Sequence, residues 1–162
     1  CYLWCFVRVF IKAPAGRQRL NVIGAVNAMT KQVHYTSNTT YVNAISIIEF
    51  LYQLAIFYYD KPIYIVLDNA RYQHCNYVKE IAQKLGITLL FMPSYSPNLN
   101  IIERLWKFIK KVALQAKYFE SFDLFEQNIL QTFKQLNSSY SDDLKSLLSL
   151  NFQRFSKSEI YP

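Results

Sequence analysis

The sequence predicts an α/β domain in which helices flank a mixed sheet, and three observations lead there. The 162 residues are 52% hydrophobic and 17% aromatic, which suits one domain with a core and not a disordered chain. Two apolar segments joined by a turn come first, as in a hairpin. Strand-like and helix-like segments then alternate, which is typical of a layered α/β fold.

The first half of the chain reads as strands followed by a helix. Residues 2–11 are almost continuously apolar and are followed by turn residues at 13–16, which predicts a strand over 2–11. Residues 20–29 and 32–36 read as a hairpin. Residues 41–58 are expected to form a helix capped by Thr39 or Thr40, because apolar residues recur there at helical spacing.

The second half alternates between strands and helices. Residues 62–67 and 87–92 read as buried strands, the first of them of the parallel type and apolar on both faces. The helices expected are 76–85, ending at Gly86; one from Asn98 or Asn100 to about 117; and 122–136. Residues 138–162 are expected to be helical in part.

Composition excludes several classes of protein. Only three glycines are present, and neither glycine-rich phosphate-binding pattern occurs. The longest apolar stretch, residues 44–59, is interrupted by Ser46, Glu49 and Gln53 and is too short to span a membrane. Three cysteines without a CxxC pair and two histidines do not make a zinc finger, so we expect a chain of the reducing cytoplasm.

The densest basic run of the sequence contains no acid. It consists of Arg104, Lys107, Lys110, Lys111 and Lys117. A polyanion such as nucleic acid is the natural partner of such a surface, although a solvated helix face would have the same composition.

Two acids lie where catalysis would need them. Asp68 directly follows the strand at 62–67, and Glu103 lies in the first turns of the next-but-one helix, with 34 residues between them (103 − 68 − 1). That interval holds one helix and one strand, so the two carboxylates can meet at one edge of the sheet. Paired carboxylates suit Mg²⁺ and phosphoryl transfer. Either acid alone could equally be a turn residue or a helix-terminal charge.

Three segments resemble the catalytic core of bacterial insertion-sequence transposases of the IS-six-thirty family, within the Tc/mariner superfamily. They are IVLDN at 65–69, RYQH at 71–74 and YSPNLNIIERLWKFIK at 95–110, with Ile101 where proline is usual. The resemblance implies an RNase H-like fold and a D…D…E triad of the DD34E type. Asp68 then corresponds to the second acid and Glu103 to the third, and both would bind Mg²⁺, with Mn²⁺ as a substitute.

The resemblance also implies a biological setting. It implies DNA cleavage and strand transfer at the terminal inverted repeats of an insertion sequence, with a TA target and a homodimer. The protein would be located in the bacterial cytoplasm, at the nucleoid, and would not bind a membrane. Residues 1–137 would be the catalytic domain and residues 138–162 a helical tail.

One departure bears on activity. Upstream of Asp68 the only acids are Glu49 and Asp60, and neither fits the first triad position. We therefore expect a transposase truncated at its N-terminus, without its helix-turn-helix domain and inactive as an isolated chain. The alternative is a decayed or domesticated transposase that only binds DNA or dimerises. Another RNase H-like nuclease, such as a Holliday-junction resolvase, fits the YSPNLNIIERLW segment less well.

The remaining candidates concern DNA binding and packing. Arg71, Tyr72 and His74 either line the DNA path or cap the next helix. Arg104, Lys107, Lys110 and Lys111 are candidates for the DNA backbone, but they cannot all point one way on a helix. Trp106 is expected to pack its helix on the sheet, and His34 to be structural. If residues 2–11 do not form the first strand, sheet edges would be exposed and the chain should aggregate.

Overall fold

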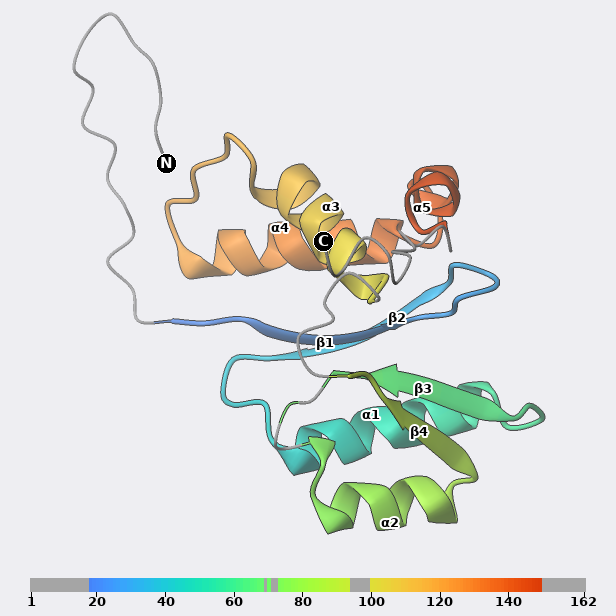
Figure 1. Cartoon of the computed structure of the whole chain (residues 1–162). Coiled ribbons are helices and arrows are strands. Elements are labelled where there is room, and N and C mark those ends of the chain that lie inside the picture. Colours follow the sequence, from blue (N-terminus) through green and yellow to red (C-terminus); the bar gives the residue numbers. More distant parts are fainter. Residues whose placement is uncertain (1–17, 69, 71–72, 94–99, 150–162) are drawn as a thin grey trace, which may run out of the picture.

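The computed structural model describes residues 18–68, 70, 73–93 and 100–149. The predicted strand at 2–11, Arg71 and Tyr72 lie outside these residues. The elements in chain order, labelled in Figure 1, are β1 (Asn21–Val26), β2 (Val33–Asn38), α1 (Ala44–Phe57), β3 (Ile63–Leu67), α2 (Asn76–Lys84), β4 (Ile87–Phe91), α3 (Ile102–Leu114), α4 (Phe122–Gln135) and α5 (Ser141–Leu147).

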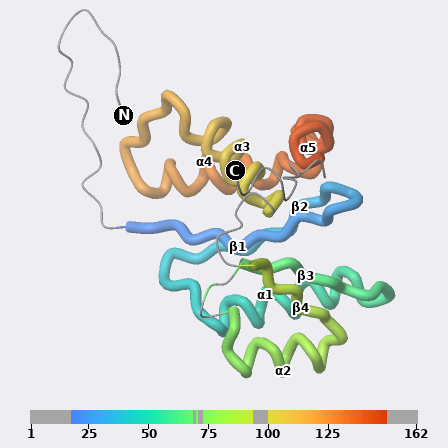
Figure 2. Tube along the Cα trace, in the orientation of Figure 1, coloured from blue at the N-terminus to red at the C-terminus, as the bar shows by residue number. Residues whose placement is uncertain are grey.

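The strands of the described residues form two ladders. Strands β1 and β2 pair in antiparallel fashion, and β3 and β4 pair in parallel. The hairpin β1–β2 crosses the middle of the molecule, with α3, α4 and α5 on one side and α1, α2, β3 and β4 on the other (Figures 1 and 2). The predicted α/β class is therefore confirmed, although the expected mixed sheet is present here as two ladders of two strands each.

The hairpin turn is built on Asn27. Its side-chain oxygen accepts hydrogen bonds from the backbone N–H groups of Met29 and Thr30, at 2.9 and 3.0 Å. Its own N–H donates to the carbonyl of Gln32, and Lys31 takes a left-handed conformation with φ of 63°. An asparagine that bonds its own turn is a common way to reverse a chain.

Helix α1 begins later than predicted. Asn43 is its N-cap, with the side-chain oxygen accepting from the N–H of Ser46 at 3.0 Å, so the expectation of Thr39 or Thr40 was wrong. Asparagine caps a helix at least as well as threonine, and here it lies directly before the first helical residue.

The ladder β3–β4 is buried on one face only. Ile63, Ile65 and Leu89 pack against the core formed with α1 and α2, whereas Tyr64 and Val66 are 66% and 56% exposed. The expectation of a strand apolar and buried on both faces was therefore wrong for β3. Among the described residues helices cover only one face of this ladder, so an apolar sequence did not translate into two-sided burial.

Of two helix ends predicted from the sequence, one agrees with the structure and one does not. Helix α2 is followed by Gly86 with φ of 68°, the left-handed conformation expected after a helix end. Helix α3 ends at Leu114, a turn earlier than the predicted boundary near 117. Lys117 then turns back, donating from Nζ to the carbonyl of Val112 at 3.1 Å.

The hydrophobic core has two parts. The larger joins α3, α4 and α5 to the hairpin, and its centre is fully buried: Leu105, Leu136, Leu144 and Leu148. The smaller joins α1, α2 and the β3–β4 ladder. Helix α5, the described part of the predicted tail, is thus packed into the same core as α3.

Two long-range contacts hold the helices on the hairpin. The amide of Asn137 bonds both backbone groups of Val33, accepting from its N–H and donating to its carbonyl, each at 2.8 Å. Trp106 packs over Gly24 of β1, as expected for a helix seated on the sheet. No helix in the described part of the chain is long and apolar enough to cross a membrane.

Candidate nuclease site

Asp68 follows β3 at the carboxyl edge of the parallel ladder. Leu67 pairs with Phe91 at the end of β4, and the N–H of Met92 donates to the carbonyl of Leu67 at 2.9 Å. The Asp68 side chain is exposed, and its Oδ1 accepts from the N–H of Ala70 at 3.2 Å. The carboxylate thus stands at the end of a strand, where open α/β sheets bind their ligands.

His74 lies at the same edge. Its ring stacks on that of Phe91, with centroids 3.9 Å apart and planes 25° apart. Phe91 is the register partner of Leu67, the residue before Asp68. The structure therefore brings His74 to the edge that carries Asp68, as the sequence interpretation required.

Two further residues at this edge were not predicted from the sequence. The Nζ of Lys79 on α2 lies 5.8 Å from the centre of the Phe91 ring, within range of a cation–π contact. Gln73 is buried, and its Oε1 has no hydrogen-bond donor among the described residues. No sequence pattern marks Lys79, because its approach to Phe91 depends on how α2 meets the end of β4, whereas Gln73 lies within the RYQH segment quoted above.

Glu103 lies in the first turn of α3. Its N–H donates to the carbonyl of Asn100 at 3.2 Å, and the Asn100 side chain accepts from the N–H of Ile102 at 3.3 Å. Asn100 thus supports the helix start from one residue further out: the N-cap is Ile101, so the expectation of Asn100 as the cap was wrong, and Asn98, the other predicted cap, lies outside the described residues. The side chain of Glu103 is exposed, in a position that the helix dipole favours for an anion.

The exposed face of α3 combines Glu103 with lysines. The helix buries Leu105 and Ile109, so positions 103, 107 and 110, spaced by four and three residues, lie together on the opposite side. Lys107, Lys110 and Lys111 are all exposed. On ideal geometry, Lys107 and Lys110 stand about 6 and 10 Å along the helix from Glu103.

Arg104 has a structural environment instead. It is half-buried, and its Nη1 donates to the carbonyl of Ser149 at 2.9 Å and to that of Leu147 at 3.5 Å. The guanidinium thereby satisfies carbonyls at the C-terminal end of α5, where a cation is also favoured by the helix dipole. This sets Arg104 apart from the exposed lysines of the same helix.

The donor types suit a hard divalent ion. Asp68 and Glu103 are both exposed carboxylates, and Mg²⁺ is typically held by one or two carboxylates with water and substrate phosphate. Within the described ranges, no three His, Cys, Asp or Glu side chains come close enough to form a metal site on their own. Carboxylates of this kind would suit a metal that shares its coordination with a phosphate.

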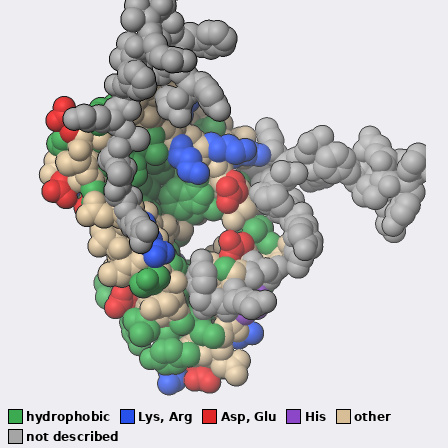
Figure 3. All heavy atoms as spheres, turned by 90° about the vertical axis from the view of Figure 1, so that its left-hand side faces the viewer, with side chains coloured by type: hydrophobic (Ala, Val, Ile, Leu, Met, Phe, Trp, Pro, Cys, Tyr) green, Lys and Arg blue, Asp and Glu red, His purple; other side chains and the backbone are tan. Residues whose placement is uncertain are grey.

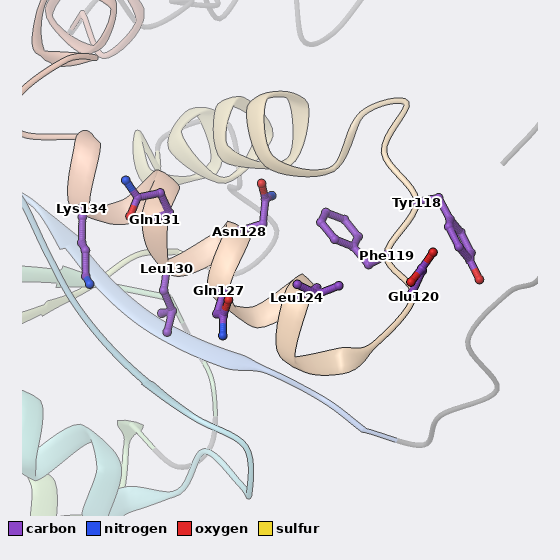
Figure 4. Close-up of a pocket in the computed structure, with 9 residues that line it drawn as sticks. All are labelled: Tyr118, Phe119, Glu120, Leu124, Gln127, Asn128, Leu130, Gln131 and Lys134. Carbon is purple, nitrogen blue, oxygen red and sulfur yellow. The ribbon is translucent and has the colours of Figure 1, made fainter.

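A hollow elsewhere on the surface is a separate feature. It is formed by the outer side of α4 and the segment before it, and its lining residues, shown in Figure 4, are Tyr118, Phe119, Glu120, Leu124, Gln127, Asn128, Leu130, Gln131 and Lys134. None of the residues predicted to act in catalysis or DNA binding lines it.

Two solved structures share the fold. One is described as the simian T-cell lymphotropic virus intasome in complex with PP2A regulatory subunit B56 gamma, with 18% identity and a TM-score of 0.53 over 70% of this chain. The matched region covers 41% of that chain. The other is the catalytic core domain of BIV integrase, with 18% identity and a TM-score of 0.54 over 75% of this chain and 81% of that one. At this level of identity the likeness shows the fold, which is RNase H-like, as predicted.

The family follows from the sequence profiles. A comparison with curated proteins gives no match. The profile described as "DDE superfamily endonuclease" matches residues 7–126, a region that contains both Asp68 and Glu103. Because this match covers most of the chain, the protein belongs to the DDE superfamily endonucleases.

Proposed function

We propose that this chain is the catalytic domain of an insertion-sequence transposase of the IS-six-thirty type, which cleaves DNA and transfers strands at terminal inverted repeats. The observation that carries the proposal is Asp68 at the carboxyl end of β3 combined with Glu103 in the first turn of α3. The YSPNLNIIERLW segment around Glu103 supports the specific family. The TA target, the dimer and the bacterial setting belong to the same proposal, as do residues 1–137 as the domain and 138–162 as its tail.

Asp68 and Glu103 would hold Mg²⁺, or Mn²⁺ in its place, as the acids of a DD34E-type site. When bound, such ions stabilise the attacking and leaving oxygens of a phosphoryl transfer. The carboxylates fix the ions, and the substrate phosphate completes the coordination.

The DNA backbone would lie along α3 and the edge beside it. Lys107, Lys110 and Lys111 offer exposed cations on the helix that carries Glu103, and His74, stacked on Phe91, lies at the edge that carries Asp68. Contacts of this kind position the duplex without reading its sequence. Arg71 is also proposed to contact the DNA backbone, and this assignment rests on the sequence alone. Arg104, also predicted to bind DNA, would act mainly by holding α5 in place.

Metal binding gives the direct test of the two acids. Mn²⁺ is titrated into the full chain and followed by electron paramagnetic resonance, with and without a short DNA duplex. Asp68→Asn or Glu103→Gln should weaken binding about tenfold or more, since even outer partners of a metal contribute that much. Asp60→Asn, at the opposite end of β3, and Glu80→Gln on α2 are matched exposed controls. Equal affinity in all five proteins would refute the assignment.

A second candidate function has one observation in its favour. The only acids before Asp68 in the sequence are Glu49 and Asp60, and neither fits the first triad position, which suits a module that binds DNA without cutting it. Incubation of the chain with end-repeat duplexes in Mg²⁺ or Mn²⁺ separates the two. Metal-dependent nicking that Glu103→Gln abolishes supports the nuclease and contradicts the predicted inactivity. Salt-sensitive binding without nicking supports the binding module.

The DNA-contact assignments predict different effects on salt dependence. Lys107→Ala or Lys110→Ala should lower DNA affinity and reduce the slope of log K against log salt by about one. Lys84→Ala, an exposed lysine at the end of α2, is the control. Arg104→Ala should instead lower stability with little change in slope. Equal slopes for all variants would remove α3 from the proposed interface.

A further inference from the structure

Helix α1 carries an apolar stripe on the side turned away from its own core. Ile45, Tyr52 and Ile56 recur at intervals of seven and four residues, and Tyr59 follows just after the helix end. Their exposed fractions are 59%, 46%, 73% and 87%. The opposite side of the same helix is already buried against α2 and the β3–β4 ladder.

The stripe is unusual for a surface helix. Glu49 is the only charged residue in the 14 residues of α1, although the whole chain carries 29 charged residues. A surface helix normally presents charged side chains outward, and a helix that is apolar all round is normally buried. Figure 3 shows hydrophobic side chains gathered on the lower part of the molecule, the level at which Figure 1 places α1, α2, β3 and β4.

The exposed area suits a protein partner. The four residues of the stripe present roughly 500 Å² of surface, within the range of the largest patches that monomers leave uncovered. A standard interface buries about 800 Å² on each partner, so the stripe could form most of its centre. The absence of Lys and Arg from α1 disfavours DNA, and also a membrane surface, which binds helices with a basic polar face.

The stripe is complementary to itself. Two copies of α1 laid antiparallel across a twofold axis at Tyr52 would bring Ile45 of each copy opposite Tyr59 of the other, since both lie seven residues from position 52. The two Glu49 carboxylates would lie about 9 Å apart along the axis, on opposite sides of it, and would not collide. The lysines of α3 belong to the other side of the hairpin, so they do not oppose one another.

We propose that a second copy of this chain packs on this stripe, α1 against α1, across a twofold axis near Tyr52. The dimer is part of the proposed function, on which this inference rests by naming the surface that joins the two copies; the metal site is tested separately, so either can fail without the other. An isologous contact of this kind closes at two copies, so it yields a dimer and not a filament.

Sedimentation equilibrium on the full chain tests the stripe. The wild-type chain should be a dimer. Ile56→Lys should raise the dimer dissociation constant at least about 30-fold, the fold-change expected for a central interface residue. Tyr77→Lys, an exposed aromatic on α2, is the matched control and should leave the constant unchanged. Circular dichroism checks that each variant is folded. If Ile56→Lys does not fold, Ile45→Lys replaces it in the same measurement.

Cross-linking tests the axis. Tyr52→Cys should give an oxidised dimer band that the native cysteines do not give, because the two introduced thiols would face each other. Glu80→Cys on α2 should give none. A wild-type monomer at all concentrations, a dimer that Ile56→Lys and Ile45→Lys leave intact, or no cross-link through position 52 would each overturn the proposal.

Discussion

Replacing Gly24 by alanine tests how α3 is seated on the hairpin. A Cβ at this position would lie 2.8 Å from Cη2 of Trp106, 3.4 Å from Cζ2 of the same ring and 3.4 Å from the carbonyl oxygen of His34. Carbon atoms pack best at 3.5–4.0 Å, so the first contact must be relieved by moving the indole. The indole is itself packed beside Phe133, with ring centroids 6.1 Å apart, and Phe133 is buried.

The expected cost follows from two opposing effects. Overpacking a filled site usually destabilises by about 1–3 kcal/mol. Replacing a glycine in a strand by alanine restricts the unfolded chain, which raises the free energy of unfolding by about 0.5–1 kcal/mol. We therefore expect Gly24→Ala to lower the free energy of unfolding by about 1–2 kcal/mol, measured by urea denaturation of the full chain.

A double-mutant cycle isolates the contact. Trp106→Phe removes the atoms that the new methyl group would meet, so Gly24→Ala should cost less in that background, with a coupling of about 1 kcal/mol. If Gly24→Ala is neutral in the wild-type chain, or costs the same in both backgrounds, then the indole does not fix α3 on β1 and the reasoning fails.

Three further changes test other parts of the fold by the same denaturation assay. Asn137→Ala should cost about 1–3 kcal/mol, because it leaves the N–H and carbonyl of Val33 unpaired. Burial lowers the pKa of His34 from its ordinary 6.5, so the neutral ring favours folding; stability should fall as pH drops below about 6.5, and His34→Gln should remove that dependence. Gly86→Ala should cost about 1 kcal/mol, since φ of 68° is unfavourable for alanine although no atom obstructs its methyl group.

The elements were predictable where local chemistry decides them. Apolar periodicity located α1 and α4, and Gly86 marked the end of α2 because a left-handed residue is needed there. The cap of α1 was misplaced because several polar residues precede the helix and each could serve. The two-sided burial expected for β3 failed because burial depends on which helices cover the ladder, and the sequence of β3 does not contain that information.

The candidate site was predictable only in part. The places of Asp68 at a strand end and of Glu103 in a first helical turn were predicted correctly, because local sequence reveals such positions. The hydrogen bond from Arg104 to the carbonyl of Ser149 was not predicted, because the two residues are 45 positions apart in the chain. Lys79 was missed for the same reason, since its neighbour Phe91 belongs to another element.

The hairpin β1–β2 links the two halves of the molecule that carry the two acids. Glu103 belongs to α3, which Trp106 seats on Gly24, and α4 is tied to Val33 by Asn137. Asp68 directly follows β3, which packs on α1.

On its other side the hairpin holds the end of α1. Nε2 of His34 lies 2.9 Å from the hydroxyl of Tyr58, and the amide of Asn27 donates to the same hydroxyl at 3.1 Å. The hairpin carries neither acid. It is nevertheless attached to α3, which carries Glu103, and to α1, on which the strand before Asp68 packs. Among the described residues, the separation of the two carboxylates therefore depends on packing at the hairpin. If the two acids bind a metal together, as proposed above, a substitution at the hairpin that leaves the chain folded should still weaken metal binding by moving one acid relative to the other, since productive sites tolerate displacements of only about half an ångström.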